Sequence, residues 1–244
     1  MKALCTYLFF ALFFVVGCSK NSGSDPAPTK ANITGSVILY DAGTNLLDKS
    51  GMKVSVEGTS PLISTTTDNA GKFTLADVPF GTYTLVYEKA GYGTSKKSGI
   101  EHKNTGTSTV ITAIPSFGQV SATTITALTA EVVGTDVLVN ATTNPAGNSS
   151  NKRYLRFFYA SAGNVSNTSY NNFSAVYIAQ INPYTHTLSK SDLNSMGFVS
   201  GTTAYIRAYG ESFWSNDYLD ITNGKTVFPN INSTTTNPVS FVVP

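Results

Sequence analysis

The chain has 244 residues, of which 41% are apolar and 12% are charged, and its formal net charge is +2. Because globular proteins usually contain about 25% charged residues, charge is scarce here and a basic nucleic-acid-binding surface is excluded. The two cysteines exclude a disulfide framework and a cysteine-rich metal site. About a third of the residues are Ser, Thr or Asn, and Tyr and Phe are plentiful, a mixture that favours β-structure. We therefore expect an all-β protein without nucleic-acid partner, metal or cofactor.

The N-terminal segment has the pattern of a signal peptide. Lys2 precedes an apolar run over residues 3–16, interrupted by Thr6 and Tyr7. As a helix this run would span about 21 Å at about 1.5 Å per residue, whereas the hydrocarbon core of a bilayer is about 30 Å thick. Residues 1–17 are therefore predicted to be a cleaved signal peptide rather than a membrane span.

The apolar run ends in the sequence VVGC, which places Cys18 at its border. This tetrapeptide resembles the lipobox of bacterial lipoproteins, here of the Bacteroidota type. The resemblance implies cleavage before Cys18 and acylation of this cysteine, so that the partner is a membrane and the location is the cell envelope, at the outer membrane. Ordinary secretory cleavage that leaves Cys18 free is the alternative, and the side of the membrane stays open. Residues 18–30 are rich in Ser, Pro and Gly and are predicted to be a flexible tether.

A first domain is predicted over residues 31–115, where short β-like runs alternate with Gly, Pro, Asn and Asp. Strands are expected at residues 33–40, 52–57, 63–67, 72–75, 83–87 and 110–114. Asp68 and Gly71 are expected to shape a hairpin turn. Phe73, Tyr83 and Leu85 are expected to fill the core.

The stretch TTDNAGKFTLADVPFGTYTLVYEKAGY, residues 66–92, resembles the carboxypeptidase regulatory-like domain. The resemblance implies a transthyretin-like β-sandwich, which accompanies zinc carboxypeptidases but is not their catalytic part. A zinc peptidase site needs paired His and Glu ligands. The two histidines, His102 and His186, lie far apart in the sequence and are interpreted as exposed residues of β-structure.

A linker is predicted at residues 116–123 and a second β-sandwich at residues 124–244. Eight strands are expected, at residues 125–133, 137–143, 153–160, 173–181, 185–188, 203–210, 225–228 and 239–243, with one helical turn near residues 190–196. Strands at this spacing are typical of a sandwich. Residues 192–209 resemble the E–F corner and F strand of fibronectin type III and immunoglobulin-like domains, although Ala204 stands where that corner normally has a tyrosine.

A candidate binding surface follows from the alternation of side chains along a strand. If Ala204, Ile206 and Ala208 face the core, the residues between them face outward. The candidate ligand-binding residues combine this stripe with a neighbouring strand and a loop tryptophan: Tyr205, Arg207, Tyr209, Trp214, Tyr154 and Arg156. Such a stripe suits sugar rings or a protein partner. The alternatives are that the aromatic pairs stabilise the sheet and that Trp214 caps the sandwich.

No pattern of acid, base or nucleophile typical of a catalytic site is present in the sequence. The chain is therefore interpreted as a non-catalytic envelope lipoprotein that presents a binding surface, with carbohydrate as the candidate ligand. The alternative is a structural spacer or accessory subunit of an outer-membrane complex with protein contacts alone.

Overall fold

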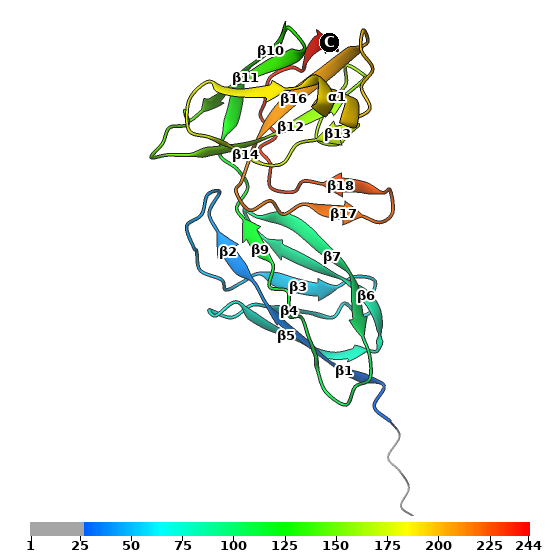
Figure 1. Cartoon of the computed structure of the whole chain (residues 1–244). Helices are drawn as coiled ribbons and strands as arrows, with labels where there is room; N and C mark the ends of the chain where they lie inside the picture. The colour runs from blue at the N-terminus through cyan, green and yellow to red at the C-terminus, as the bar shows by residue number, and fades with distance from the viewer. Residues whose placement is uncertain (1–26) are drawn as a thin grey trace, which may run out of the picture.

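Two β-sandwiches lie end to end in the computed structural model, which describes residues 27–244 (Figure 1). The all-β prediction is confirmed, because the short segment Lys190–Ser195 is the single helix of the described residues. That helix is far too short to cross a bilayer, and residues 27–244 hold no other candidate. The predicted signal peptide, Cys18 and residues 19–26 of the predicted tether lie outside the described residues.

The first sandwich contains nine strands. They are β1 (Lys30–Ser36), β2 (Ile38–Tyr40), β3 (Lys53–Val56), β4 (Ser64–Thr66), β5 (Lys72–Pro79), β6 (Gly81–Lys89), β7 (Gly93–His102), β8 (Thr109–Val110) and β9 (Ser116–Gly118). One sheet has the order β4–β3–β6–β7 and the other the order β5–β1–β8, with β2 and β9 as a short parallel pair. The apolar side chains between the sheets include Ile33, Val54 and Leu85, all fully buried.

The hairpin before β5 confirms the predicted turn. The Asp68 carboxylate accepts hydrogen bonds from the backbone N–H groups of Ala70 at 2.9 Å and Lys72 at 2.8 Å. Gly71 has a φ of +80°, and a Cβ atom there would lie 2.4 Å from the Val37 carbonyl oxygen. This position therefore requires glycine for both conformation and space. Beyond the turn Phe73 is buried, as predicted.

Strand β7 was not expected from the sequence, and it corrects the interpretation of His102. The strand pairs with β6 along most of its length. His102 at its end is 1% exposed rather than lying on the surface. Its Nδ1 lies 2.7 Å from the Thr109 hydroxyl and its Nε2 3.0 Å from the Val78 carbonyl oxygen. Both ring nitrogens are thus engaged within the first sandwich, so His102 has a structural role.

The segment predicted as a linker is built into the fold. Residues 116–118 form β9, which runs parallel to β2, and Phe117 is buried in the core of the first sandwich. Beyond β9 the chain stays bonded, because the N–H of Val120 donates to the Gly91 carbonyl oxygen at 2.6 Å and that of Ser121 to the Asn230 carbonyl oxygen at 2.9 Å. The two domains are therefore joined by a structured crossing.

The second sandwich contains ten strands and helix α1 (Lys190–Ser195), which matches the predicted helical turn. The strands are β10 (Thr124–Val133), β11 (Asp136–Asn144), β12 (Arg153–Ala160), β13 (Asn172–Phe173), β14 (Tyr177–Ala179), β15 (Tyr184–Leu188), β16 (Thr203–Glu211), β17 (Tyr218–Asp220), β18 (Lys225–Val227) and β19 (Val239–Val242). The expected strand at 173–181 is thus split into β13 and β14, which both pair with β12.

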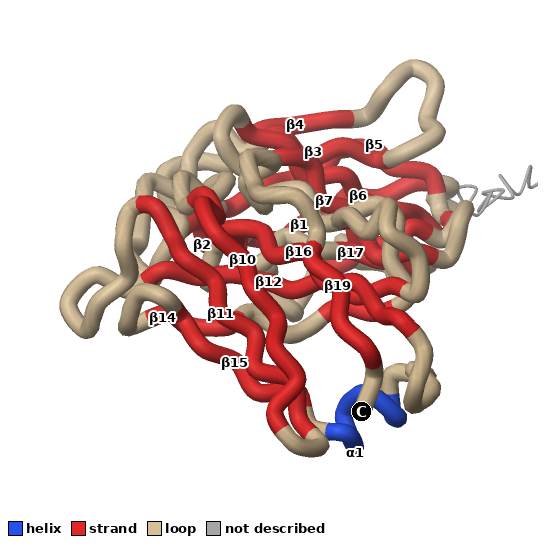
Figure 2. The backbone as a smooth tube through the Cα atoms, turned by 90° about the horizontal axis from the view of Figure 1, so that it is seen from above, coloured by secondary structure: helices blue, strands red, loops and turns tan. Residues whose placement is uncertain are grey.

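Two sheets enclose the core of the second sandwich. One has the order β10–β11–β15, and the other the order β13–β12–β16–β19 with β14 also on β12. Seen from above in Figure 2, β10, β11 and β15 run side by side and α1 lies near the C-terminus. The β17–β18 hairpin leaves this sandwich and lies beside β7 of the first one (Figure 1).

Candidate functional site

The predicted outward stripe has the expected parity but is not an exposed surface. Ala204, Ile206 and Ala208 are fully buried in the inner core, as predicted. On the opposite face Tyr209 is 4% exposed, and Tyr205 is half-buried. The stripe is therefore covered, which corrects the expectation that it lies open to a ligand.

A second, smaller core covers this outer face. Its centre is Phe158, which is fully buried and packs against Tyr209 and Phe228 with ring centroids 5.5 and 4.9 Å apart. The covering residues come from the segments that follow β12 and β18. They are Val165, Tyr170, Phe228 and Ile231. Arg207 is half-buried as well, with its Nε donating to the Thr236 carbonyl oxygen at 3.0 Å.

Arg156, a predicted site residue, forms a buried ion pair with Glu211. Its Nε donates to the Glu211 carboxylate at 3.1 Å, and its guanidinium also donates to the Ser174 carbonyl oxygen at 2.7 Å. Arg156 is 4% exposed and Glu211 is fully buried. Burial raises the pKa of the Glu211 carboxyl to about 7, although Arg156 and the Ser212 N–H act in the opposite direction. The ion pair therefore belongs to the framework rather than to an open binding surface.

Trp214 lies against the first sandwich. Its ring stacks on Tyr40 at the end of β2, with centroids 5.0 Å apart and planes inclined by 26°. Phe213 packs edge-on against Trp214 on one side and Tyr154 on the other, at 5.2 and 5.5 Å. These four rings form a continuous aromatic row across the domain junction. Of the two roles expected for Trp214, packing at the end of the sandwich is therefore the one observed, and the packing is between the domains.

Two buried asparagines fasten the junction. The Asn216 side-chain amide donates to the carbonyl oxygens of Tyr92 at 2.7 Å and Gly118 at 2.8 Å, and its Oδ1 accepts from the Gly118 N–H at 2.9 Å. Asn230 accepts from the Asn216 N–H at 3.0 Å and donates to the Trp214 carbonyl oxygen at 2.9 Å. Because both side chains are almost completely buried, these bonds hold the domains in one orientation.

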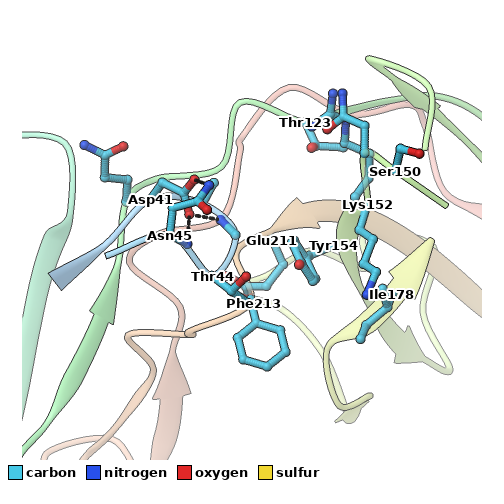
Figure 3. A pocket seen from close by; sticks show the side chains of 15 residues that line it. Asp41, Thr44, Asn45, Thr123, Ser150, Lys152, Tyr154, Ile178, Glu211 and Phe213 are labelled. Atoms are coloured by element: carbon cyan, nitrogen blue, oxygen red, sulfur yellow. Dashed lines mark hydrogen bonds between the residues drawn. The ribbon is translucent and has the colours of Figure 1, made fainter. Parts of the chain in front are cut away.

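A cleft of about 750 Å³ opens beside this junction, with walls from both domains (Figure 3). Residues 41–45, after β2, form one wall, and residues 150–154, at the start of β12, form the other. Tyr154, at the end of the second wall, lies beside Glu211 in the middle of the cleft, with Phe213 below them (Figure 3). Thr44, Asn45, Gln119, Thr123, Ser150 and Asn151 add uncharged polar groups to the lining. The cleft therefore combines many hydrogen-bonding side chains with an aromatic base.

The charged groups of the cleft are largely occupied by the protein itself. The Asp41 carboxylate accepts from the backbone N–H of Gly43 at 2.7 Å and from the Asn45 amide at 2.6 Å, which fixes the β2 loop. Glu211 is bonded to Arg156, and the Arg153 Nε donates to the Pro145 carbonyl oxygen at 3.2 Å. Lys152 is exposed at the rim. Because the other charged groups are already bonded within the protein, the cleft suits a polar, uncharged molecule that binds through hydrogen bonds rather than through ion pairs.

Comparison with known proteins bears on the first sandwich. Residues 32–115 match the family model of the carboxypeptidase regulatory-like domain. This match agrees with the motif at residues 66–92 and with the transthyretin-like sandwich. It covers the first domain and leaves the second domain and most of the cleft outside its bounds. No curated protein matches the chain.

Matches among solved structures include three proteins from Bacteroides and Parabacteroides species. A Bacteroides uniformis protein proposed to bind carbohydrate is 16% identical, with 87% of this chain and 98% of that chain covered at a TM-score of 0.32. A DUF3823 family protein from Bacteroides ovatus is 12% identical. The match covers 88% of this chain and 100% of that chain, with a TM-score of 0.29. Another DUF3823 family protein, from Parabacteroides merdae, is 12% identical. The match covers 84% of this chain and 98% of that chain, with a TM-score of 0.28.

Of the six predicted site residues, Tyr154 is the one that lines the cleft. Arg156 and Tyr209 are buried nearby, Tyr205 and Arg207 lie under the outer core, and Trp214 is at the junction. Sequence reasoning missed the wall at residues 41–45 and the polar residues at 150–152. Their signal was present as two Asn- and Gly-containing turns, but nothing in the sequence indicated that the two turns face each other.

Proposed function

We propose that the protein is a non-catalytic binding protein whose junction cleft takes an uncharged oligosaccharide. The observation that carries this proposal is the lining of the cleft, where uncharged hydroxyl and amide side chains from two domains surround Tyr154 and Phe213. Sugars present hydroxyl groups to such side chains and C–H faces to aromatic rings. A volume of about 750 Å³ lies within the range of about 300–1,000 Å³ typical of small-molecule sites.

The state of the two carboxylates in the cleft supports binding rather than hydrolysis. Glycosidases use a pair of carboxyl groups that flank the scissile bond and act on substrate or water. Here Asp41 is held by the N–H groups of its own loop, and Glu211 is held by Arg156 beneath the surface. Neither group is left for proton transfer to a bound sugar.

The fixed domain orientation also supports a binding role. Both walls of the cleft depend on the junction, and the bonds of Asn216 and Asn230 order that junction before any ligand arrives. A preformed site loses less conformational entropy on binding. The single aromatic row from Tyr40 to Tyr154 gives the base of the cleft a rigid support.

The test is retention of the detergent-solubilised full chain in native gels that contain neutral polysaccharides. Thr44→Arg and Ser150→Arg place a long charged side chain in the cleft at exposed positions. We expect both variants to lose retention on the polysaccharide that slows the wild type. The matched control is Thr129→Arg on β10, an exposed position outside the cleft, which should migrate like the wild type.

Equal retention of the cleft variants and the control would contradict the cleft as the site. Absence of binding across a broad panel of plant, host and bacterial glycans would instead favour the alternative, a spacer or accessory subunit with protein contacts alone. The melting temperature of each variant checks that the fold is intact.

We further propose that acyl chains on Cys18 anchor the protein in the outer membrane and that residues 19–27 hold the domains clear of it. The tether is shorter than the predicted 18–30, because Lys30 begins β1 and the Pro28 and Thr29 carbonyl oxygens accept hydrogen bonds from Asn104 and Phe80. About nine flexible residues reach on the order of 15 Å. Labelled palmitate should enter the wild type and not Cys18→Ala. A chain that carries no label and retains Met1 would contradict the anchor.

A further inference from the structure

A second pocket, of about 280 Å³, lies at the open edge of the second sandwich. Its lining comes from β12 to β15 and from α1, and includes Tyr159, Tyr177, His186 and Asp192. Tyr159 and the cleft residue Tyr154 are on the same strand, five positions apart, which corresponds to about 16 Å at about 3.3 Å per residue. An odd separation also places their side chains on opposite faces of the sheet. The pocket is therefore separate from the junction cleft.

Tyr159 lines this pocket, and its hydroxyl makes no hydrogen bond to the described residues 27–244. The residue as a whole is 2% exposed. The hydroxyl oxygen itself is not fully enclosed, so it is hydrated from the pocket when no ligand is bound. A bound molecule is therefore positioned to replace this water and to form a hydrogen bond with the hydroxyl. Burial raises the pKa of Tyr159, so the group stays a neutral phenol.

One wall of the pocket is a neutral aromatic pair. The rings of Tyr177 and His186 have centroids 4.4 Å apart, and the Tyr177 hydroxyl lies 3.2 Å from the His186 Nε2. Phe157 stacks behind His186 at 5.7 Å. Burial lowers the pKa of His186 below its ordinary 6.5, so the imidazole is uncharged at pH 7. This outcome corrects the expectation of an exposed surface histidine.

Asp192 supplies a negative charge at the mouth of the pocket. Its Oδ2 accepts from the Ser189 N–H at 3.0 Å and the Ser189 hydroxyl at 2.7 Å, as part of the capping box of α1. These bonds lower the pKa of Asp192 and leave Oδ1 without a bond inside residues 27–244. The negative charge of Asp192 acts to raise the pKa of Tyr159, Tyr177 and His186, although burial outweighs it at His186 and keeps that pKa low. The lining contains no lysine or arginine to balance it.

We propose that this pocket binds an alkylammonium group, carried by a small amine or by a lysine side chain of a partner. Aromatic faces attract a cation through the ring quadrupole, and the Asp192 carboxylate adds a charge-assisted hydrogen bond or ion pair. The Tyr159 hydroxyl accepts one N–H or contacts an N-methyl group. A neutral sugar hydroxyl donates a hydrogen bond to a carboxylate but leaves its charge uncompensated, whereas an ammonium ion donates the bond and also neutralises the charge. This proposal is independent of the proposed function of the cleft.

The test is a titration of the full chain with n-butylammonium and tetramethylammonium chloride, followed by the NMR signals of the His186 ring. The neutral isostere 3,3-dimethylbutan-1-ol and an equal concentration of sodium chloride are the ligand controls. We expect saturable shifts with both ammonium ions and none with the controls. Nα-acetyl-lysine amide, which carries a protein-type ammonium group, distinguishes the two sources: binding as tight as that of n-butylammonium points to a lysine side chain, and weaker binding points to a small amine.

Two conservative variants give the decisive comparison. Asp192→Asn keeps an oxygen for the Ser189 cap and removes the charge, and Tyr159→Phe removes the hydroxyl and keeps the ring. We expect Asp192→Asn to weaken binding about tenfold, and Tyr159→Phe to weaken it about threefold. The matched controls are Asp217→Asn and Tyr218→Phe, which lie outside this pocket and should bind like the wild type. An unchanged affinity in Asp192→Asn, or equal binding of the neutral isostere, would overturn the proposal.

Discussion

The two faces of the β13–β12–β16–β19 sheet carry different residues yet are both buried. The inner face is lined by Leu155, Ile206 and Ala208, which meet the opposite sheet across the sandwich. The outer face carries Phe158, Arg156 and tyrosines, which meet loop segments instead. The inner face is closed by regular structure that a periodic pattern predicts. The outer face is closed by irregular segments that leave no periodic signal.

This difference shows that outward parity and exposure are separate properties. Alternation along β16 correctly assigns each side chain to a face. Whether that face meets solvent depends on Tyr170, Phe228 and Ile231, which lie outside the strands of this sheet. Aromatic and arginine residues on an outer face therefore indicate either a binding surface or a second core.

The largest effect is expected from Phe158→Ala on the outer face. The side chain is fully buried among four other rings, at centroid distances of 4.9–6.4 Å. Its removal should lower the free energy of unfolding by about 4 kcal/mol, as in any aromatic core position. Urea unfolding measures this loss in free energy. The Ile206→Ala variant, on the inner face of the same sheet, gives the reference value for a core position. A loss below about 0.5 kcal/mol would mean that the outer face is a surface after all.

Arg156→Met should lower the free energy of unfolding by about 3 kcal/mol, because it leaves Glu211 buried without its cation. The double variant Arg156→Met/Glu211→Leu removes both charges and should recover most of this loss. Urea unfolding at pH 8 compares the two. If the double variant is as unstable as the single one, the ion pair itself rather than the unpaired charge is what stabilises the outer face.

Stability should depend on pH through Glu211, whose pKa rises from 4.5 to about 7 on folding. Between these values the folded state holds a proton that the unfolded state has lost, so stability falls as pH rises from about 4.5 to about 7. The change amounts to at most about 3 kcal/mol. His186, with a lowered pKa, acts in the opposite direction near pH 6.5. The contribution of Glu211 is therefore the difference between the wild type and Glu211→Gln, and a difference independent of pH would exclude it.

The smallest effect is expected from Tyr205→Ala at the edge of the outer core. Tyr205 is half-buried and packs against this core without forming its centre. We expect a loss of about 1 kcal/mol in the free energy of unfolding, measured by the same urea titration. A loss of stability equal to that of Phe158→Ala would show that Tyr205 contributes as much to the outer core as its central residue does.

The sequence predicts the first sandwich best where side chains and turns must satisfy local geometry. Asp68 and Gly71 identify their hairpin because few other residues can form that turn. Strand β7 escaped prediction because its sequence, GTSKKSGIEH, has a single apolar residue, Ile100. It is an edge strand that pairs with β6 alone, so backbone hydrogen bonds define it and side-chain pattern does not.

The cleft could not be predicted because it exists between two domains. Its walls at residues 41–45 and 150–154 are distant in sequence, and each is an ordinary polar turn when considered alone. The position of one wall against the other depends on Asn216 and Asn230. In the sequence these two are indistinguishable from the many asparagines of surface loops.

The parallel pair of β2 and β9 has a mechanical consequence if the protein is anchored at Cys18 as proposed. The chain enters the first sandwich before β2 and leaves it directly after β9. A pull between the N-terminal end and the second domain therefore draws the two parallel strands past each other along their length. In this shear geometry the backbone hydrogen bonds between Ile38–Tyr40 and Ser116–Gly118 resist the force at the same time. They do not break one after another, as they would if the strands were peeled apart. The β1–β8 pair, also parallel, is loaded in the same sense.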